Sequence, residues 1–96
     1  MRKMIKIKRE FKIELHTRHY LNGQLAVYVN DKIGHPIAEL SIMNDLVTLA
    51  PNEFILKDYS ENKELAQELL ETNLFVPTDQ FILIGSHLCT VCQINS

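Results

Sequence analysis

Residues 54–73, FILKDYSENKELAQELLETN, contain the one helical pattern that we recognise in this 96-residue chain. The apolar residues after position 62 lie on a single stripe of a helix, as Leu65, Ala66, Leu69 and Leu70. We expect Asp58 or Ser60 to cap this helix, with Glu61 placed as in a capping box. The mainly apolar stretch before it, residues 54–57, indicates a short strand that leads into the helix.

The residues on the N-terminal side of this segment have the alternating pattern of β-strands. Between residues 5 and 15 the apolar residues fall on odd positions, and residues 8–10 interrupt them as either a tight turn or a bulge. Asn22-Gly23 predicts a hairpin turn. Strands are expected at residues 25–29 and at about 37–43, where the residues predicted to face inward are Ala38, Leu40 and Ile42.

Two more strands are expected on the C-terminal side, at residues 81–84 and 88–94, after Pro77 has ended the helical segment. The whole pattern predicts one α+β domain spanning residues 1–96. We expect a mainly antiparallel sheet of five or six strands with one helix packed on one face. A content of 46% hydrophobic and 23% charged residues agrees with a soluble globular domain of this length.

The formal net charge of −2 is divided unevenly along the chain. Residues 1–20 hold seven basic and two acidic residues, a charge of +5, whereas residues 21–96 hold three basic and ten acidic residues, a charge of −7. One part of the molecule could therefore face an acidic partner and the other a basic partner. Alternatively, both parts are solvated surface or pair with each other after folding.

Two candidate binding surfaces follow from this division. The candidate protein-binding surface is the acidic face of the helix, formed by Glu61, Glu64, Glu68 and Glu71. The alternative is a nucleic-acid-binding surface on the basic N-terminal segment, formed by Lys3, Lys6, Lys8, Arg9 and Lys12.

The residues that most often carry chemistry do not form a known motif here. Cys89 and Cys92 match C-x-x-C, with His87 close by, but a structural zinc site requires a fourth ligand. On a strand, residues three apart point to opposite faces, so we expect two separate thiols, with zinc binding or redox chemistry as the alternatives. The four histidines and three glycines fit neither a catalytic nor a phosphate-binding spacing. We therefore expect a protein that is not an enzyme, with no catalytic residue, cofactor or metal.

Four segments carry a resemblance to a known family: YLNGQLAV (residues 20–27), HPIAELS (35–41), FILKDYSEN (54–62) and VCQI (91–94). They resemble an uncharacterised family of small proteins carried by plasmids, phages and integrative elements of Gram-positive bacteria. That family has no established activity, so the resemblance implies no catalytic residue. It implies a setting, namely an accessory protein of a mobile genetic element.

These observations favour a non-enzymatic interaction protein that inhibits a host nucleic-acid-targeting defence, of the anti-CRISPR or anti-restriction type. Its partner would be a host protein such as a nuclease or a nuclease–guide complex. The alternative is a nucleic-acid-binding accessory or regulatory protein. The absence of a signal peptide and of an apolar run long enough to cross a bilayer predicts a cytoplasmic protein that binds no membrane. A homodimer is a further expectation, because edge strands of a small sheet can pair with their copies.

Overall fold

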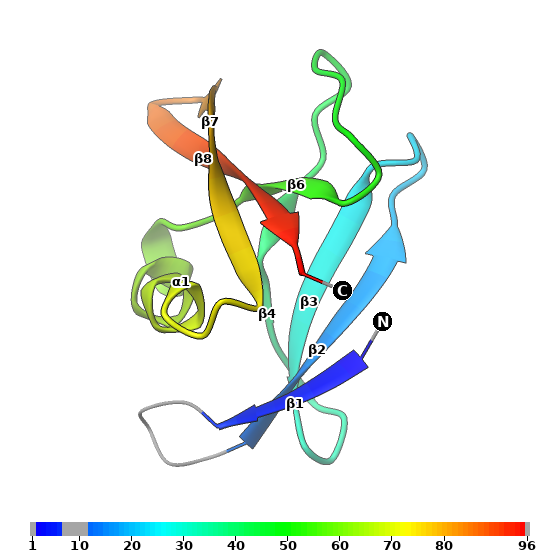
Figure 1. The fold of residues 1–96 in the computed structure, drawn as a ribbon, viewed down its shortest axis with the longest axis vertical. Coiled ribbons are helices and arrows are strands. Elements are labelled where there is room, and N and C mark those ends of the chain that lie inside the picture. The colour runs from blue at the N-terminus through cyan, green and yellow to red at the C-terminus, as the bar shows by residue number, and fades with distance from the viewer. Residues whose placement is uncertain (1, 7–11, 96) are drawn as a thin grey trace.

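Two antiparallel sheets and one short α-helix make up residues 2–6 and 12–95, the part of the chain described in this computed structural model (Figure 1). The elements follow the chain in the order β1 (Arg2–Lys6), β2 (Lys12–His19), β3 (Leu25–Asp31), β4 (Pro36–Glu39), β5 (Ser41–Ile42), β6 (Glu53–Leu56), the 3₁₀ turn η1 (Ser60–Asn62), α1 (Lys63–Leu70), β7 (Phe75–Ile84) and β8 (His87–Ile94). The α+β class expected from the sequence is confirmed.

The strands form two four-stranded sheets, in the orders β1-β2-β3-β4 and β5-β6-β8-β7. The expectation of a single sheet with five or six strands is therefore wrong. The chain passes from the first sheet to the second at Leu40, which separates β4 from β5. The backbone N–H of Leu40 donates to the carbonyl of Val27 over 2.8 Å, and its own carbonyl accepts the N–H of Lys57 over 2.7 Å. One residue thus connects the backbones of both sheets.

The first sheet is an antiparallel series of neighbouring strands, as the alternating sequence predicts. β1 and β2 are separate antiparallel strands with Ile5 opposite Ile13. The interruption at residues 8–10, expected as a tight turn or a bulge, lies outside the described residues. The β2–β3 turn is also confirmed. Its Gly23 has a φ of +86°, and the Gly23 N–H donates to the Tyr20 carbonyl over 2.9 Å.

The main core lies between the two sheets and is closed by α1. The buried apolar residues of the first sheet are Ile13, Leu15, Val27 and Val29, those of the second are Phe54, Leu56, Phe75, Cys92 and Ile94, and those of the helix are Leu65, Ala66 and Leu69. Phe54 and Phe75 pack edge to face with their ring centroids 5.3 Å apart. The apolar stripe predicted from the sequence is thus the face by which α1 joins this core.

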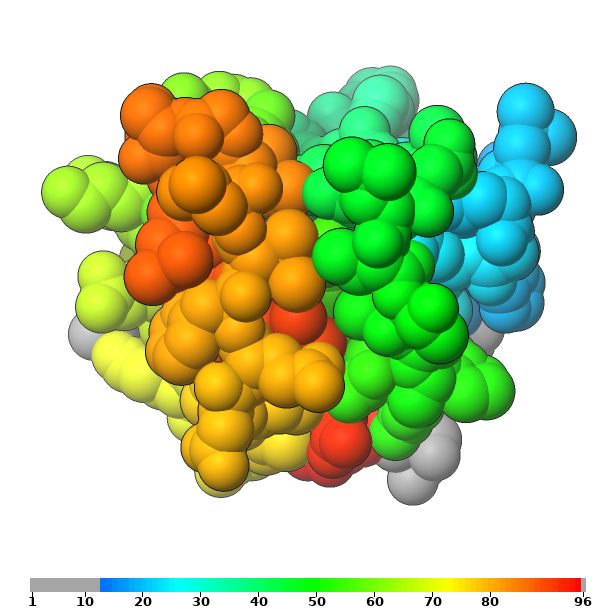
Figure 2. Space-filling view, turned by 90° about the horizontal axis from the view of Figure 1, so that it is seen from above, coloured from blue at the N-terminus to red at the C-terminus, as the bar shows by residue number. Residues whose placement is uncertain are grey.

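A second apolar cluster lies on the other face of the second sheet, around Ile55, Cys89 and Val91. Residues 43–52 form a loop that covers it, and in Figure 2 this loop (green) lies beside the β7–β8 hairpin (orange and red). Ile42 packs against this cluster and not in the main core, so the prediction that Ile42 faces inward with Leu40 is wrong. The change of sheet at Leu40 is the reason.

The start of the helix also differs from the prediction. Tyr59 and Asn62 occupy the N-cap positions of η1 and α1, and neither makes a side-chain capping hydrogen bond. The predicted cap by Asp58 or Ser60 is therefore wrong. Ser60 instead has a φ of +55°, and its carbonyl accepts the N–H of Lys63 at the first residue of α1.

Candidate functional site

The acidic helix surface, defined as Glu61, Glu64, Glu68 and Glu71, follows η1 and α1 but is not uniform. Glu64 and Glu71 are exposed on the side of α1 opposite its buried stripe, because residues seven apart return to the same helix face. Glu68 lies to one side of them, half-buried, and its Oε2 atom is buried. Glu64 and Glu71 are thus the two members most open to a partner.

Glu61 has a cationic neighbour on the segment before the helix. The ammonium of Lys57 donates to Glu61 Oε1 over 3.0 Å. Glu61 accepts a hydrogen bond from its own backbone N–H, and this bond and the bond from Lys57 lower the pKa of the Glu61 carboxyl. The same side-chain hydrogen bond raises the pKa of Lys57. A basic partner at Glu61 would therefore compete with Lys57.

Of the basic N-terminal segment, the structure describes the backbone of Lys3, Lys6 and Lys12. By backbone register Lys3 lies opposite Leu15, a core residue, whereas Lys6 lies opposite Lys12. Lys8 and Arg9 lie outside the described residues. The strand register therefore separates Lys3 from the pair at positions 6 and 12, as alternation along a strand also indicates.

The structure also brings together a group of residues on the first sheet that the sequence analysis did not single out. His16 lies opposite Tyr28 in the β2–β3 register, and Arg18 is the next residue of β2 on the same face. These side chains, with Asn30, Gly34 and Pro36, line a hollow of about 380 Å³. This face could have been predicted from the sequence. The Asn22-Gly23 turn sets the register of the two strands, and even-numbered positions of both strands then share one face.

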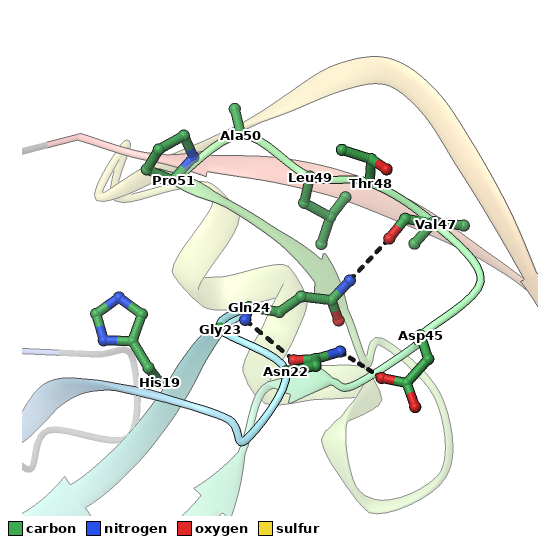
Figure 3. Close-up of a pocket in the computed structure, with 10 residues that line it drawn as sticks. All are labelled: His19, Asn22, Gly23, Gln24, Asp45, Val47, Thr48, Leu49, Ala50 and Pro51. Atoms are coloured by element: carbon green, nitrogen blue, oxygen red, sulfur yellow. Dashed lines mark hydrogen bonds between the residues drawn. The ribbon is translucent and has the colours of Figure 1, made fainter.

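A second hollow, of about 360 Å³, lies between the β2–β3 turn and the loop of residues 43–52 (Figure 3). The side-chain amide of Gln24 donates to the carbonyls of Asn44 and Val47 over 2.8 and 3.0 Å, and its oxygen accepts the N–H of Asn44 over 2.9 Å. Asn22 Nδ2 donates to Asp45 Oδ1 over 2.8 Å. These hydrogen bonds hold the β2–β3 turn against the loop of residues 43–52, and they define the shape of the hollow.

The two cysteines point to opposite faces of β8, as the strand alternation predicts. Cys92 is buried in the main core and Cys89 in the second cluster. Burial raises the pKa of both thiols, that of Cys92 to about 12, and the negative charge of Asp58 adds to the effect. His87 is stacked on Tyr59 with the ring centroids 3.9 Å apart. In residues 2–6 and 12–95 no three His, Cys, Asp or Glu side chains are grouped so as to hold a metal ion.

Comparison of the chain with models of protein families, with curated proteins and with solved structures gave no match. Within the described part of the chain, no helix has the length and apolar character needed to cross a membrane. In the part of the chain that the structure describes, the candidate surfaces are the acidic helix surface and the hollow lined by His16, Arg18 and Tyr28, called here the His16–Tyr28 face.

Proposed function

We propose that this protein is a non-enzymatic interaction protein that binds a basic protein partner through the acidic helix surface. The observation that carries the proposal is the exposure of Glu64 and Glu71 on a helix whose opposite face is fixed in the main core. The backbone of a rigid element loses little conformational freedom on binding, and its carboxylates attract a positive surface over about one Debye length, roughly 8–10 Å.

The chemistry of such a surface favours a partner that normally binds nucleic acid. A channel lined by Lys and Arg recognises phosphates by charge, and a surface bearing several carboxylates can occupy the same channel. The resemblance to proteins of mobile genetic elements supports a nuclease or nuclease–guide complex of a host defence as that partner, in the cytoplasm. The protein would then act as an inhibitor of the anti-CRISPR or anti-restriction type.

The experiment is a pull-down from a Gram-positive lysate with and without nuclease treatment, read by mass spectrometry and repeated with the purified partner. Glu64→Gln combined with Glu71→Gln removes two charges from the acidic helix surface with little change in shape. Asp45→Asn combined with Asp79→Asn is the matched control: it removes two charges from exposed positions elsewhere, and the amide oxygen that Asp45→Asn introduces can still accept the hydrogen bond from Asn22 Nδ2.

We expect the pull-down at low salt to capture a nucleic-acid-targeting protein and to retain it after nuclease treatment. The Glu64/Glu71 double variant should weaken binding at least about tenfold, and the control should change it less than about twofold. Equal binding by both double variants would show that the acidic helix surface is not the binding surface.

A second candidate function, nucleic-acid binding, is favoured by the His16–Tyr28 face of the first sheet. Arg18 can contact a phosphate while the Tyr28 ring offers a surface on which a base can stack. Arg18→Ala is the test and Lys32→Ala is the matched control, because both remove one positive charge from an exposed position. Salt-dependent binding to a single-stranded oligonucleotide that only Arg18→Ala weakens would support this function. Loss of every captured partner after nuclease treatment would favour it over the first.

A further inference from the structure

The β7 strand forms one free edge of the second sheet. In the sheet order β5-β6-β8-β7, β7 is terminal, and among the described residues only β8 pairs with it. A terminal strand presents unpaired N–H and C=O groups that can pair with another chain. In Figure 2 the atoms of β7 and of the turn that follows it (orange) lie at the surface, beside the loop of residues 43–52 (green).

The first half of this edge carries features that oppose pairing with another strand. Pro77 has no backbone N–H to donate, and a register shift between Pro77 and Phe81 bends the strand. Asp79 places a charge in the same stretch. These are the features by which natural sheets protect an edge.

The second half of the edge has none of these features. Its residues 81–84 read Phe-Ile-Leu-Ile, without a charge, a proline or a further register shift. The other three sheet ends are different: β1 has three basic residues among its five, β4 begins with Pro36 and ends with Glu39, and β5 is only two residues long. Among the edge strands of the two sheets, residues 81–84 of β7 are therefore the segment without a feature that opposes pairing with another strand.

The side chains of this segment add an exposed apolar surface. Leu83 lies opposite Leu88, and Phe81 is two residues away on the same face of the hairpin. Phe81, Leu83 and Leu88 are 54%, 66% and 63% exposed. Apolar side chains gathered in this way favour contact with another protein surface.

We propose that β7 pairs with β7 of a second copy of this chain through residues 81–84, in an antiparallel two-fold arrangement. In a symmetric antiparallel pair with Ile82 on the axis, Phe81 lies directly opposite the partner's Leu83, and Leu83 opposite the partner's Phe81. Aromatic–aliphatic pairs of this kind stabilise sheets.

A second copy is the occupant that the charge pattern favours. From Gln80 to Leu88 the sequence has no acidic residue, no Lys and no Arg, so two copies would meet here without repulsion between like charges. Pairing would extend the second sheet from four strands to eight. Because the paired segment is short, the interface would fall at the small end of known interfaces, and we expect a dissociation constant of about 1–100 μM.

The test is sedimentation equilibrium of the full chain at protein concentrations from about 1 to about 500 μM, which bracket that constant. We expect the wild-type mass to rise from 11.1 kDa toward twice that value. Leu83→Lys should raise the dissociation constant at least about tenfold, because it places two ammonium groups at the paired edge. Leu46→Lys is the matched control, since Leu46 is 94% exposed on a different loop, and it should leave the constant unchanged.

A second measurement separates strand pairing from general adhesion of the apolar surface. Amide hydrogen exchange at residues 81–84 should slow as the concentration of the wild-type protein rises. Circular dichroism of Leu83→Lys and Leu46→Lys is the control for folding. A wild-type protein that stays monomeric at the highest concentration, or a dimer that Leu83→Lys does not weaken, would overturn the proposal.

Discussion

The side-chain amide of Asn62 donates a 2.7 Å hydrogen bond to the carbonyl of Glu39, the residue before the point where the chain changes sheet. Asn62 is only 1% exposed, at the end of η1 and just before α1. This hydrogen bond fixes the start of the helix against the last residue of β4.

Replacing Asn62 should therefore destabilise the fold. Asn62→Ala removes a buried side chain and leaves the part-buried Glu39 carbonyl without its Asn62 donor, which should lower the free energy of unfolding by about 1–3 kcal/mol. Gln67→Ala on the exposed face of the same helix is the matched control, with an expected change below about 0.5 kcal/mol. Urea unfolding at neutral pH measures both. Equal effects of the two substitutions would contradict a specific role for the Asn62 hydrogen bond.

Tyr20 predicts a pH dependence of stability. Its hydroxyl donates to a carboxylate oxygen of Glu39 and lies 2.8 Å from Ser41 Oγ, and burial and this carboxylate raise the pKa of Tyr20 above its ordinary value of 10.0. A tyrosine whose pKa is higher in the folded state contributes stability that is fully present below pH 10.0. That contribution is lost as the pH rises toward the folded-state pKa, because the unfolded chain ionises first.

The comparison of wild type with Tyr20→Phe isolates this effect, since other titrations are common to both proteins. The wild type should be more stable by a constant amount of about 1–2 kcal/mol below about pH 9. The difference should shrink above about pH 10. Urea unfolding across that range measures it, and a difference independent of pH would contradict the assignment.

The buried thiols should be inert in the folded protein. Cys89 and Cys92 are both 0% exposed, and their raised pKa values disfavour the reactive thiolate. At about pH 8 we expect neither to react with a thiol reagent such as DTNB in the native state and both to react in denaturant. Ser86→Cys in the exposed β7–β8 turn is the positive control and should react at once. Rapid native-state modification of the wild-type chain would show that β8 opens locally.

The sequence predicted most strands because one face of each is apolar, and it failed where tertiary structure changes the role of a residue. The alternation through residues 37–43 is real, but the chain changes sheet at Leu40, so Ile42 belongs to a different cluster. The strand predicted at residues 81–84 begins earlier, at Phe75, and so includes Pro77. An edge strand can hold a proline because a missing N–H on its free side costs little.

The candidate sites show the same distinction between local pattern and spatial arrangement. Helical periodicity correctly placed Glu64 and Glu71 on the outward side of α1, whereas only the packed structure shows that Glu68 is half-buried. The face formed by His16 and Tyr28 depends on register between two strands. Register follows from the hairpin turn together with burial, and single-strand alternation does not define it.

Ser60 provides a final prediction, because the sequence indicated a capping role that the backbone conformation excludes. Its φ of +55° lies in the left-handed region, which costs a non-glycine residue about 1–2 kcal/mol. Ser60→Gly removes this strain but increases the entropy of the unfolded chain, so we expect a net gain of about 0.5–1 kcal/mol in the free energy of unfolding. Ser86→Gly is the matched control: Ser86 is also exposed but has no positive φ, so glycine there should lower stability. Thermal and urea unfolding of both variants test the sign directly, and a loss of stability for Ser60→Gly would mean that the serine side chain contributes more than the strain costs.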